Sequence, residues 1–148
     1  GQRPIMEQYL DFATRNWTLF ALLGVIIAML AGTELMRVFR RYKTVSVNDA
    51  LNLYNQRDAL LLDVREVAEF RDGHLPSARN IPLSSVKNKL SELESDRSRP
   101  VVVYCRTGTR SGGACNLLSK NGFEQVHNLS GGIQAWESAN LPVVKGRK

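Results

Sequence analysis

The run Val101-Val102-Val103-Tyr104-Cys105-Arg106-Thr107-Gly108-Thr109-Arg110-Ser111 is the clearest indicator of the architecture. Its first four residues are continuously apolar, the pattern of a strand buried on both faces. A loop containing a glycine follows, and residues 110–121 then have the pattern of a helix that ends at Asn121-Gly122. In open α/β sheets, ligands bind at the carboxyl ends of strands, beside helix N-termini. We therefore expect a functional loop directly after this strand.

Residues 44–148 alternate between short apolar runs and helical patterns. Such alternation predicts an α/β fold with a mainly parallel sheet. The expected strands are 44–47, 59–64, 79–81, 101–104, 125–129 and 143–144, and the expected helices are 48–56, 66–72, 84–93, 110–121 and 132–139.

Cys105 lies at a position where several groups favour the ionised thiolate over the thiol. At the start of a helix it faces unpaired backbone N–H groups and the positive end of the helix dipole. Arg106 and Arg110 add positive charge, and Gly108 lets the loop close tightly. These features predict a lowered pKa for Cys105 and a nucleophile inside a small anion cradle. The alternative, a small buried apolar side chain at a strand end, does not require two arginines and a glycine turn.

The segment WTLFALLGVIIAMLAGT, residues 17–33, holds no charge. As a helix it would be about 25 Å long, the short end of what crosses a bilayer. Arg15 and Arg37 can reach the headgroups, and Trp17, Phe39 and Tyr42 suit the two interfaces. The predicted organisation is an N-terminal flank (1–16), a transmembrane helix (17–36), a basic juxtamembrane linker (37–43) and one globular domain (44–148).

The charges that flank this segment differ on its two sides. The side-chain charges of residues 1–16 sum to zero, whereas residues 34–43 carry four basic residues and one acidic residue. The positive-inside rule then predicts a single-pass protein of the cell inner (plasma) membrane, with its N-terminus outside and its globular domain in the cytoplasm. A cleaved signal peptide fits poorly, because residues 1–16 carry no net positive charge and Met29-Leu30-Ala31 is a poor cleavage site. A helix buried in a soluble domain would need a larger protein to cover it.

Gly24, Ala28 and Gly32 fall on one face of this helix. Small residues at that spacing let a second membrane helix pack closely, so another membrane protein is a candidate partner. Glycine and alanine are also common in membrane helices without such a role.

Composition excludes several classes of protein. With 148 residues, the chain has room for one domain and a short extra element. Two cysteines and two histidines exclude a disulfide framework and argue against a structural zinc site, and 43% apolar residues exclude a disordered chain. The net charge of +6 raises the question of nucleic-acid binding, but interleaved aromatic and basic residues and a recognisable motif are lacking.

Four segments in order resemble the signatures of the rhodanese family of sulfurtransferases, with Ser77 where the family usually has glycine. They are Leu61-Leu62-Asp63-Val64-Arg65 with Glu69-Phe70; Gly73-His74-Leu75-Pro76-Ser77-Ala78-Arg79-Asn80-Ile81-Pro82; the Cys105 loop; and Gly131-Gly132-Ile133 with Ala135-Trp136. The resemblance implies a five-stranded parallel sheet flanked by helices, here preceded by the transmembrane helix.

The resemblance also implies a chemistry. Arg110 follows Cys105 after four residues, which resembles the sulfurtransferase loop rather than the longer loop of the related phosphatases. Cys105 would take a sulfane sulfur from a donor such as thiosulfate, form a persulfide, and pass the sulfur to cyanide or a thiol, including a thioredoxin-like acceptor. Arg106 would pair with the donor's sulfonate, without a metal or other cofactor. The substrate-binding residues would be Arg106, Thr107, Gly108, Thr109, Arg110 and Ser111.

Other residues receive supporting roles by the same resemblance. Asp63 and Arg65 would support the loop through ion pairs, and His74 would be a structural hydrogen-bonding residue. Cys115 is either a core thiol or a resolving cysteine for Cys105. A different class of function also remains open, because some family members act as binding modules. The chain would then be a membrane-tethered interaction module with little or no turnover.

Overall fold

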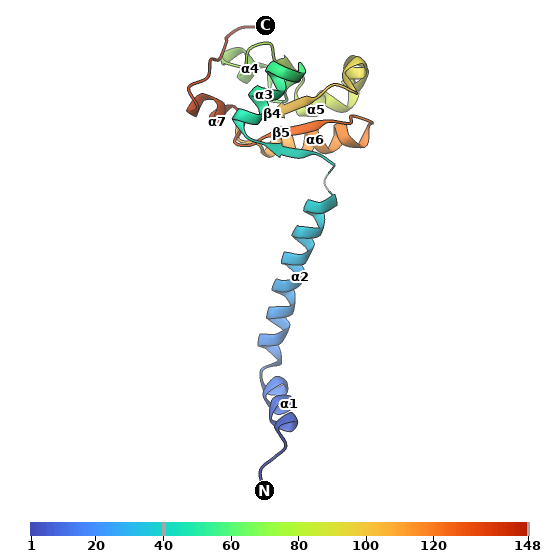
Figure 1. The fold of residues 1–148 in the computed structure, drawn as a ribbon, viewed down its shortest axis with the longest axis vertical. Helices are drawn as coiled ribbons and strands as arrows, with labels where there is room; N and C mark the ends of the chain where they lie inside the picture. The colour runs from blue at the N-terminus through green and yellow to red at the C-terminus, as the bar shows by residue number, and fades with distance from the viewer. Residues whose placement is uncertain (40, 148) are drawn as a thin grey trace. The chain divides into compact units, whose positions relative to one another are not determined.

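A parallel sheet of five strands forms the centre of the computed structural model, which describes residues 1–39 and 41–147 (Figure 1). The strand order is β1-β5-β4-β2-β3. Because Asp63 pairs with Tyr104 and Val103 with Asn128, the carboxyl ends of β2, β4 and β5 meet at one edge of the sheet. The strands are β1 (Lys43–Val45), β2 (Leu60–Asp63), β3 (Arg79–Asn80), β4 (Val101–Tyr104) and β5 (Val126–Leu129).

Helices connect the strands, and local sequence signals mark where several of them begin. Ser46 accepts a hydrogen bond from the Asp49 N–H at the start of α3, and Glu66 and Glu69 form a reciprocal capping box at the start of α4. The helices are α3 (Val47–Arg57), α4 (Val67–Asp72), α5 (Leu83–Val86), the 3₁₀ segment η1 (Lys87–Asp96), α6 (Thr109–Lys120) and α7 (Gly132–Ser138).

The two faces of the sheet are buried in separate apolar clusters. Leu60 and Leu62 of β2 face one cluster, which includes residues of α5, η1 and α6. Leu61, between them, faces the other cluster, which includes residues of α3, α4 and α7. Neighbouring residues of a strand point to opposite faces, so a strand covered on both sides must be apolar throughout. This explains why β2 and β4 are continuous apolar runs.

The predicted fold class is confirmed, with two local corrections. Residues 143–144 are not a strand, because Val144 forms only an isolated antiparallel bridge with His74. The helix expected over 84–93 is divided into α5 and η1, and Lys89 within η1 has non-helical backbone angles.

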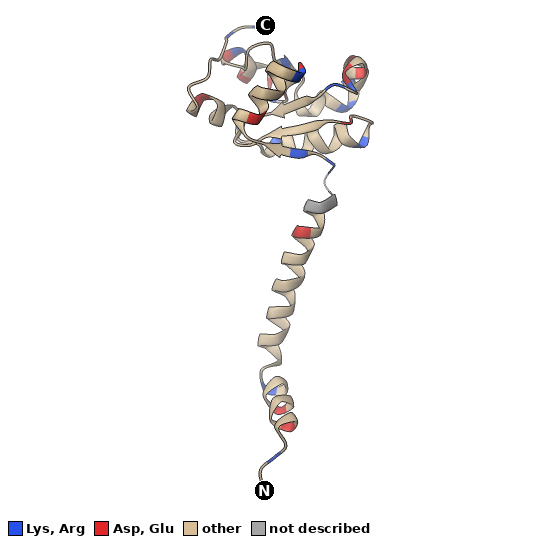
Figure 2. Cartoon of the chain, in the orientation of Figure 1, with Lys and Arg blue, Asp and Glu red and all other residues tan. Residues whose placement is uncertain are grey.

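Residues Gly1–Arg40 form a second compact unit, distinct from Arg41–Lys148. It contains α1 (Ile5–Arg15) and α2 (Trp17–Phe39). Trp17–Met36 has a mean hydropathy of 2.2, and none of it is buried in the structure, so α2 is long and apolar enough to cross a membrane (Figure 2). A signal sequence can meet the same criteria. The side chains of Arg37 and Phe39, expected at the membrane interface, and Arg40 of the basic linker lie outside the described residues.

Core packing on β2 should dominate the stability of the globular unit. We expect Leu62→Ala, at a fully buried position, to lower the free energy of unfolding by about 3 kcal/mol. The control Val67→Ala, at a position that is 45% exposed, should cost less than about 1 kcal/mol. Urea denaturation followed by Trp136 fluorescence measures both, and equal losses would contradict the burial assignment.

Candidate active site

The loop from Cys105 to Gly108 lies between β4 and α6, at the edge where the carboxyl ends of the central strands meet. Gly108 precedes the first residue of α6 with a φ of 111°, a conformation that side-chain-bearing residues rarely adopt. The glycine therefore lets the chain turn from strand to helix within a short loop. The loop from Cys105 to Gly108 therefore lies where the sequence predicted it, directly after β4.

The sulfur of Cys105 is enclosed by hydrogen-bond donors. Cys105 is only 1% exposed, and its Sγ accepts a hydrogen bond from the Gly108 N–H at 3.1 Å. The Ser111 hydroxyl lies 3.4 Å from the same sulfur. Burial by itself raises the pKa of Cys105, but hydrogen bonds from these and neighbouring groups outweigh burial and lower that pKa. The donors are the Ser111 hydroxyl and the backbone N–H groups of Thr107, Gly108 and Ser111.

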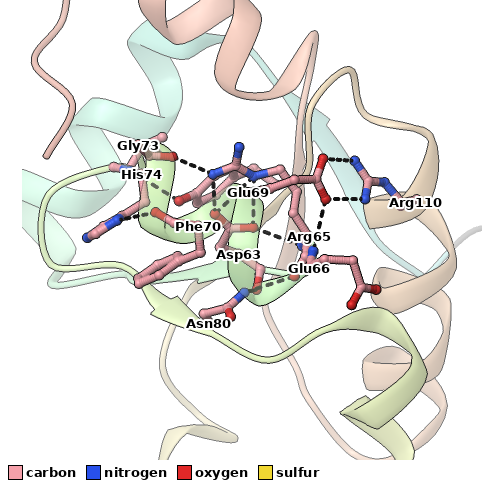
Figure 3. A network of polar contacts seen from close by, with 11 residues as sticks. Asp63, Arg65, Glu66, Glu69, Phe70, Gly73, His74, Asn80 and Arg110 are labelled. Carbon is pink, nitrogen blue, oxygen red and sulfur yellow. Dashed lines mark hydrogen bonds and ion pairs between the residues drawn. The ribbon is translucent and has the colours of Figure 1, made fainter. Parts of the chain in front are cut away.

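The two loop arginines have different surroundings. Arg110 donates to both carboxylate oxygens of Glu69, at 2.8 and 2.9 Å (Figure 3). The hydrogen bonds from Arg110 lower the pKa of Glu69 to about 2. Arg106 is exposed instead, and it lines a pocket. The largest effects that favour the Cys105 thiolate are therefore hydrogen bonds rather than the two full positive charges that the sequence emphasised.

Asn128 in β5 is a site residue that the sequence analysis missed. Its Oδ1 accepts a hydrogen bond from the Ser111 hydroxyl at 2.6 Å, and its Nδ2 donates to the Gly108 carbonyl at 3.2 Å. The available signal was a polar asparagine within a predicted strand, because a polar side chain that becomes buried needs hydrogen-bond partners. Asn128 thus fastens the loop to the neighbouring strand.

The Ser111 hydroxyl has one proton and two neighbours that can accept it. While the hydroxyl donates to Asn128, its oxygen can accept the S–H of a protonated Cys105. When Cys105 ionises, the Ser111 hydroxyl stabilises the thiolate if it rotates and donates its proton to the sulfur. Asn128 Oδ1 then no longer accepts a hydrogen bond from that hydroxyl. Asn128 therefore competes with the Cys105 thiolate for the Ser111 proton.

The N-terminus of α7 holds the loop from the other side. The Ile133 N–H donates to the Cys105 carbonyl at 2.9 Å, and the Gln134 N–H donates to the Arg106 carbonyl at 3.3 Å. Gly132 makes this approach possible, because a Cβ there would lie 2.6 Å from the Arg106 carbonyl oxygen and still closer to that of Cys105. This contact accounts physically for the glycine at residue 132.

Asp63 and Arg65 form a buried ion pair (Figure 3). The Arg65 Nη2 lies 2.7 Å from Asp63 Oδ2 and also donates to the Gly73 carbonyl. The pair thus joins the carboxyl end of β2 to the turn after α4. The ion pair that reaches the loop residue Arg110 comes from Glu69 of α4, a residue that the sequence analysis noted only as part of a signature.

His74 and Cys115 are both buried. The His74 Nδ1 donates to the Phe70 carbonyl at 2.8 Å, and its ring stacks on Phe70, an arrangement that fits the structural role expected for it. Both cysteines are free, and burial raises the pKa of Cys115. Cys115 packs in an apolar cluster that includes Leu118 and also Cys105, so its surroundings are those of a core thiol but do not by themselves exclude a resolving role.

A pocket of about 260 Å³ adjoins the loop, and Arg106 forms part of its wall. Its lining residues are Arg65, Glu69, Asp72, Arg106, Ile133, Gln134 and Glu137. In the part of the chain that the structure describes, no group of three or more His, Cys, Asp or Glu side chains could hold a metal ion. The arrangement as a whole is a buried, activated thiol beside a pocket with charges of both signs.

Known proteins are similar to this chain in sequence and in fold. The model of the Rhodanese-like domain family matches residues 46–139. The uncharacterized protein YibN of Escherichia coli is 32% identical over 144 residues, which cover 96% of this chain and 100% of YibN. The thiosulfate sulfurtransferase GlpE of Vibrio cholerae is 35% identical, over 67% of this chain and 92% of GlpE. The crystal structure of a rhodanese-related protein from Thermoplasma volcanium is 33% identical with a TM-score of 0.63, and the match covers 71% of this chain and all of that one.

Opposite effects are expected from removing Ser111 and Asn128 as partners. Ser111→Ala takes away a donor to the sulfur and should move the pH midpoint of Cys105 alkylation upward. Asn128→Leu leaves the hydroxyl free to donate to the sulfur and should move that midpoint downward. Each change in rate at pH 7 should be about fivefold, the ratio that corresponds to one hydrogen bond of ~1 kcal/mol. Rates with iodoacetamide measure this, and Ser119→Ala, which removes another buried hydroxyl of α6, is the control. An upward shift for both variants would contradict the prediction and would show that Asn128 affects the sulfur more by fastening Gly108 than by competing for the Ser111 proton.

Gly132→Ala should displace the loop. Its φ of 56° and the two carbonyl oxygens leave no room for a methyl group, so we expect a loss of at least about 2 kcal/mol in stability. The fast alkylation of Cys105 should be lost with it. Gly113→Ala is the matched control, because its new Cβ would lie 3.9 Å from the nearest side chain. Thermal unfolding measures the stability of the two variants, and alkylation rates measure the state of Cys105. Small and equal changes in both variants would contradict the packing argument.

Proposed function

The chain belongs to the rhodanese-like domain family, and from that membership we propose that it is a sulfurtransferase whose Cys105 carries the transferred sulfur as a persulfide. The observation that supports this most directly is the buried Cys105 sulfur within hydrogen-bonding reach of the Gly108 N–H and the Ser111 hydroxyl. A persulfide anion on the same residue would extend into a loop that carries several donors.

Thiosulfate is the proposed donor. The Cys105 thiolate attacks the outer, sulfane sulfur of thiosulfate, and the S–S bond of the donor breaks. Sulfite leaves with the bonding electron pair, so the negative charge on the enzyme passes from the thiolate to the persulfide. Arg106, exposed beside the pocket, is suited to pair with the donor's sulfonate. The Vibrio cholerae relative is a thiosulfate sulfurtransferase, which also supports this donor.

The second half of the cycle returns the enzyme to its starting state. An acceptor thiolate or cyanide attacks the outer sulfur of the persulfide, and the Cys105 thiolate leaves. The acceptor gains the sulfur as a persulfide or as thiocyanate. A thiol on a small molecule or on a thioredoxin-like protein is the proposed acceptor, and the chemistry requires neither a metal nor another cofactor.

The proposed location is the inner (plasma) membrane. The apolar α2 would span the bilayer once, with the N-terminus outside and residues 44–148 in the cytoplasm as the catalytic domain. The excess of basic residues over 34–43 supports that orientation. Gly24, Ala28 and Gly32 would be the contact face if α2 pairs with a helix of another membrane protein.

The structure favours chemistry over the alternative of an interaction module. A module that only binds partners has no need of a thiol with a lowered pKa in a loop held by Asn128 and by the N-terminus of α7. In the described part of the chain, these features act on the loop that holds the sulfur of Cys105.

Cys105→Ser tests the proposed reaction. Incubation of the unaltered protein with thiosulfate should add about 32 Da, the mass of one sulfur atom, to the peptide that contains Cys105. Cys105→Ser should gain no sulfur and should lose at least about a hundredfold in thiocyanate formation from thiosulfate and cyanide. Intact-mass analysis and a thiocyanate assay measure the two effects.

Cys115→Ala is the matched control, because it removes the other thiol of the chain, which lies in α6 outside the Cys105–Gly108 loop. This variant should keep the adduct and most of the activity. Turnover that survives Cys105→Ser, or a sulfur adduct on Cys115, would overturn the mechanism. An unaltered protein that never gains sulfur from thiosulfate would overturn the proposed donor.

A further inference from the structure

The helix α1 separates cleanly into an apolar face and a polar face. At about 100° per residue, its six apolar residues fall within one arc of about 160°, and its five polar residues occupy the remainder. The apolar face consists of Ile5, Met6, Tyr9, Leu10, Phe12 and Ala13. The polar face consists of Glu7, Gln8, Asp11, Thr14 and Arg15.

This apolar face is not covered within its own unit. Its five large side chains are 58% to 70% exposed. The Phe12 ring meets the Phe20 ring of α2 edge-on, with centroids 6.2 Å apart, and this contact leaves most of the face open. A contiguous apolar stripe of this kind is a surface for binding, because exposure to water is unfavourable for it.

The position of α1 in the chain indicates what covers the stripe. Asn16 alone separates α1 from α2, so the end of α1 is held within a few ångströms of the start of the apolar span. Trp17, the first residue of α2, is a residue type enriched at the membrane–water interface. With 11 residues, α1 is about 16 Å long and too short to cross a bilayer itself. Helices of this kind bind in the plane of the interface.

We propose that α1 lies along the surface of the membrane that α2 crosses, with its apolar face toward the acyl chains and its polar face toward water. This inference rests on the proposed membrane anchoring by α2. The occupant of the apolar stripe is then lipid rather than protein.

The charges of α1 specify the kind of lipid contact. Glu7, Asp11 and Arg15 leave the polar face without a positive excess, and Asp11 and Arg15 form an ion pair. Attraction to anionic headgroups therefore contributes little, and binding depends on apolar burial. We expect the contact to be the same on zwitterionic and anionic bilayers and to persist at high salt.

Depth-dependent quenching of a fluorophore tests the placement in the full-length chain. In a Cys105→Ser, Cys115→Ala background, single cysteines replace Tyr9 on the apolar face, Gln8 on the polar face or Ile26 in α2, and each carries an environment-sensitive label. The protein is reconstituted in phosphatidylcholine vesicles, with or without phosphatidylglycerol. Quenching lipids carry a spin label either near the headgroup or near the middle of the acyl chain.

The label at Tyr9→Cys should be quenched at least about threefold more than the label at Gln8→Cys, and best by the shallow spin label. The label at Ile26→Cys should be quenched best by the deep one. Equal, weak quenching at positions 8 and 9 with strong quenching at 26 would overturn the surface helix and leave the anchor standing. Absence of quenching at 26 would overturn the anchor and the inference with it.

Two further outcomes bear on the occupant. Shielding of the Tyr9→Cys label that disappears when the protein is diluted into excess lipid would identify a second copy of the chain as the cover and would overturn the lipid assignment. Quenching that falls several-fold at high salt or without phosphatidylglycerol would overturn the apolar mode of binding. Equal quenching under all of these conditions supports the proposal.

Discussion

The candidate site depends on one balance, between burial of the Cys105 sulfur and the hydrogen bonds that it accepts. Burial opposes the thiolate, and the N–H and O–H donors around the sulfur outweigh burial. These donors act only at short range, so the backbone of the loop has to be held in place. Gly108 permits the turn, Asn128 ties the loop to β5, and α7 supplies N–H groups to the loop carbonyls. Most of the fold around the sulfur can be understood as support for that geometry.

The distribution of charge fits the transfer of a single sulfur atom. Glu69 engages the Arg110 guanidinium through both carboxylate oxygens, which leaves the sulfur surrounded mainly by dipoles. Dipoles arranged in advance can stabilise an anion without binding it irreversibly, and in the proposed cycle the outer sulfur of the persulfide has to pass to the next acceptor. Arg106 is exposed and lines the pocket beside the loop, the place proposed for a charged donor. In the proposed reaction, different groups would thus hold the sulfur and attract the donor.

The sequence predicts those parts of the structure that are local. The apolar run of β4, the turn at Gly108 and the helix after it follow from period and residue type, and the sheet follows from their alternation with other elements. Asn128 and Glu69 act on the loop from β5 and α4, and no local pattern shows which strand ends or helices become neighbours. The apolar pair at residues 143–144 predicts a strand, but a strand also needs a neighbouring strand to pair with. In the structure, the backbone of Val144 forms an isolated bridge with His74.

In the N-terminal unit, the order of the residues carries information that their net charge does not. Residues 1–16 have no net charge, and this sum is informative about membrane orientation only. The order of the same residues places every apolar side chain of α1 on one face. Lifting such a helix off the surface would expose its apolar face to water, and pulling it into the bilayer would bury the charges of Glu7, Asp11 and Arg15 in hydrocarbon. The proposed anchor would therefore hold the catalytic domain at the membrane more firmly than α2 alone, and sulfur acceptors would have to meet the enzyme there.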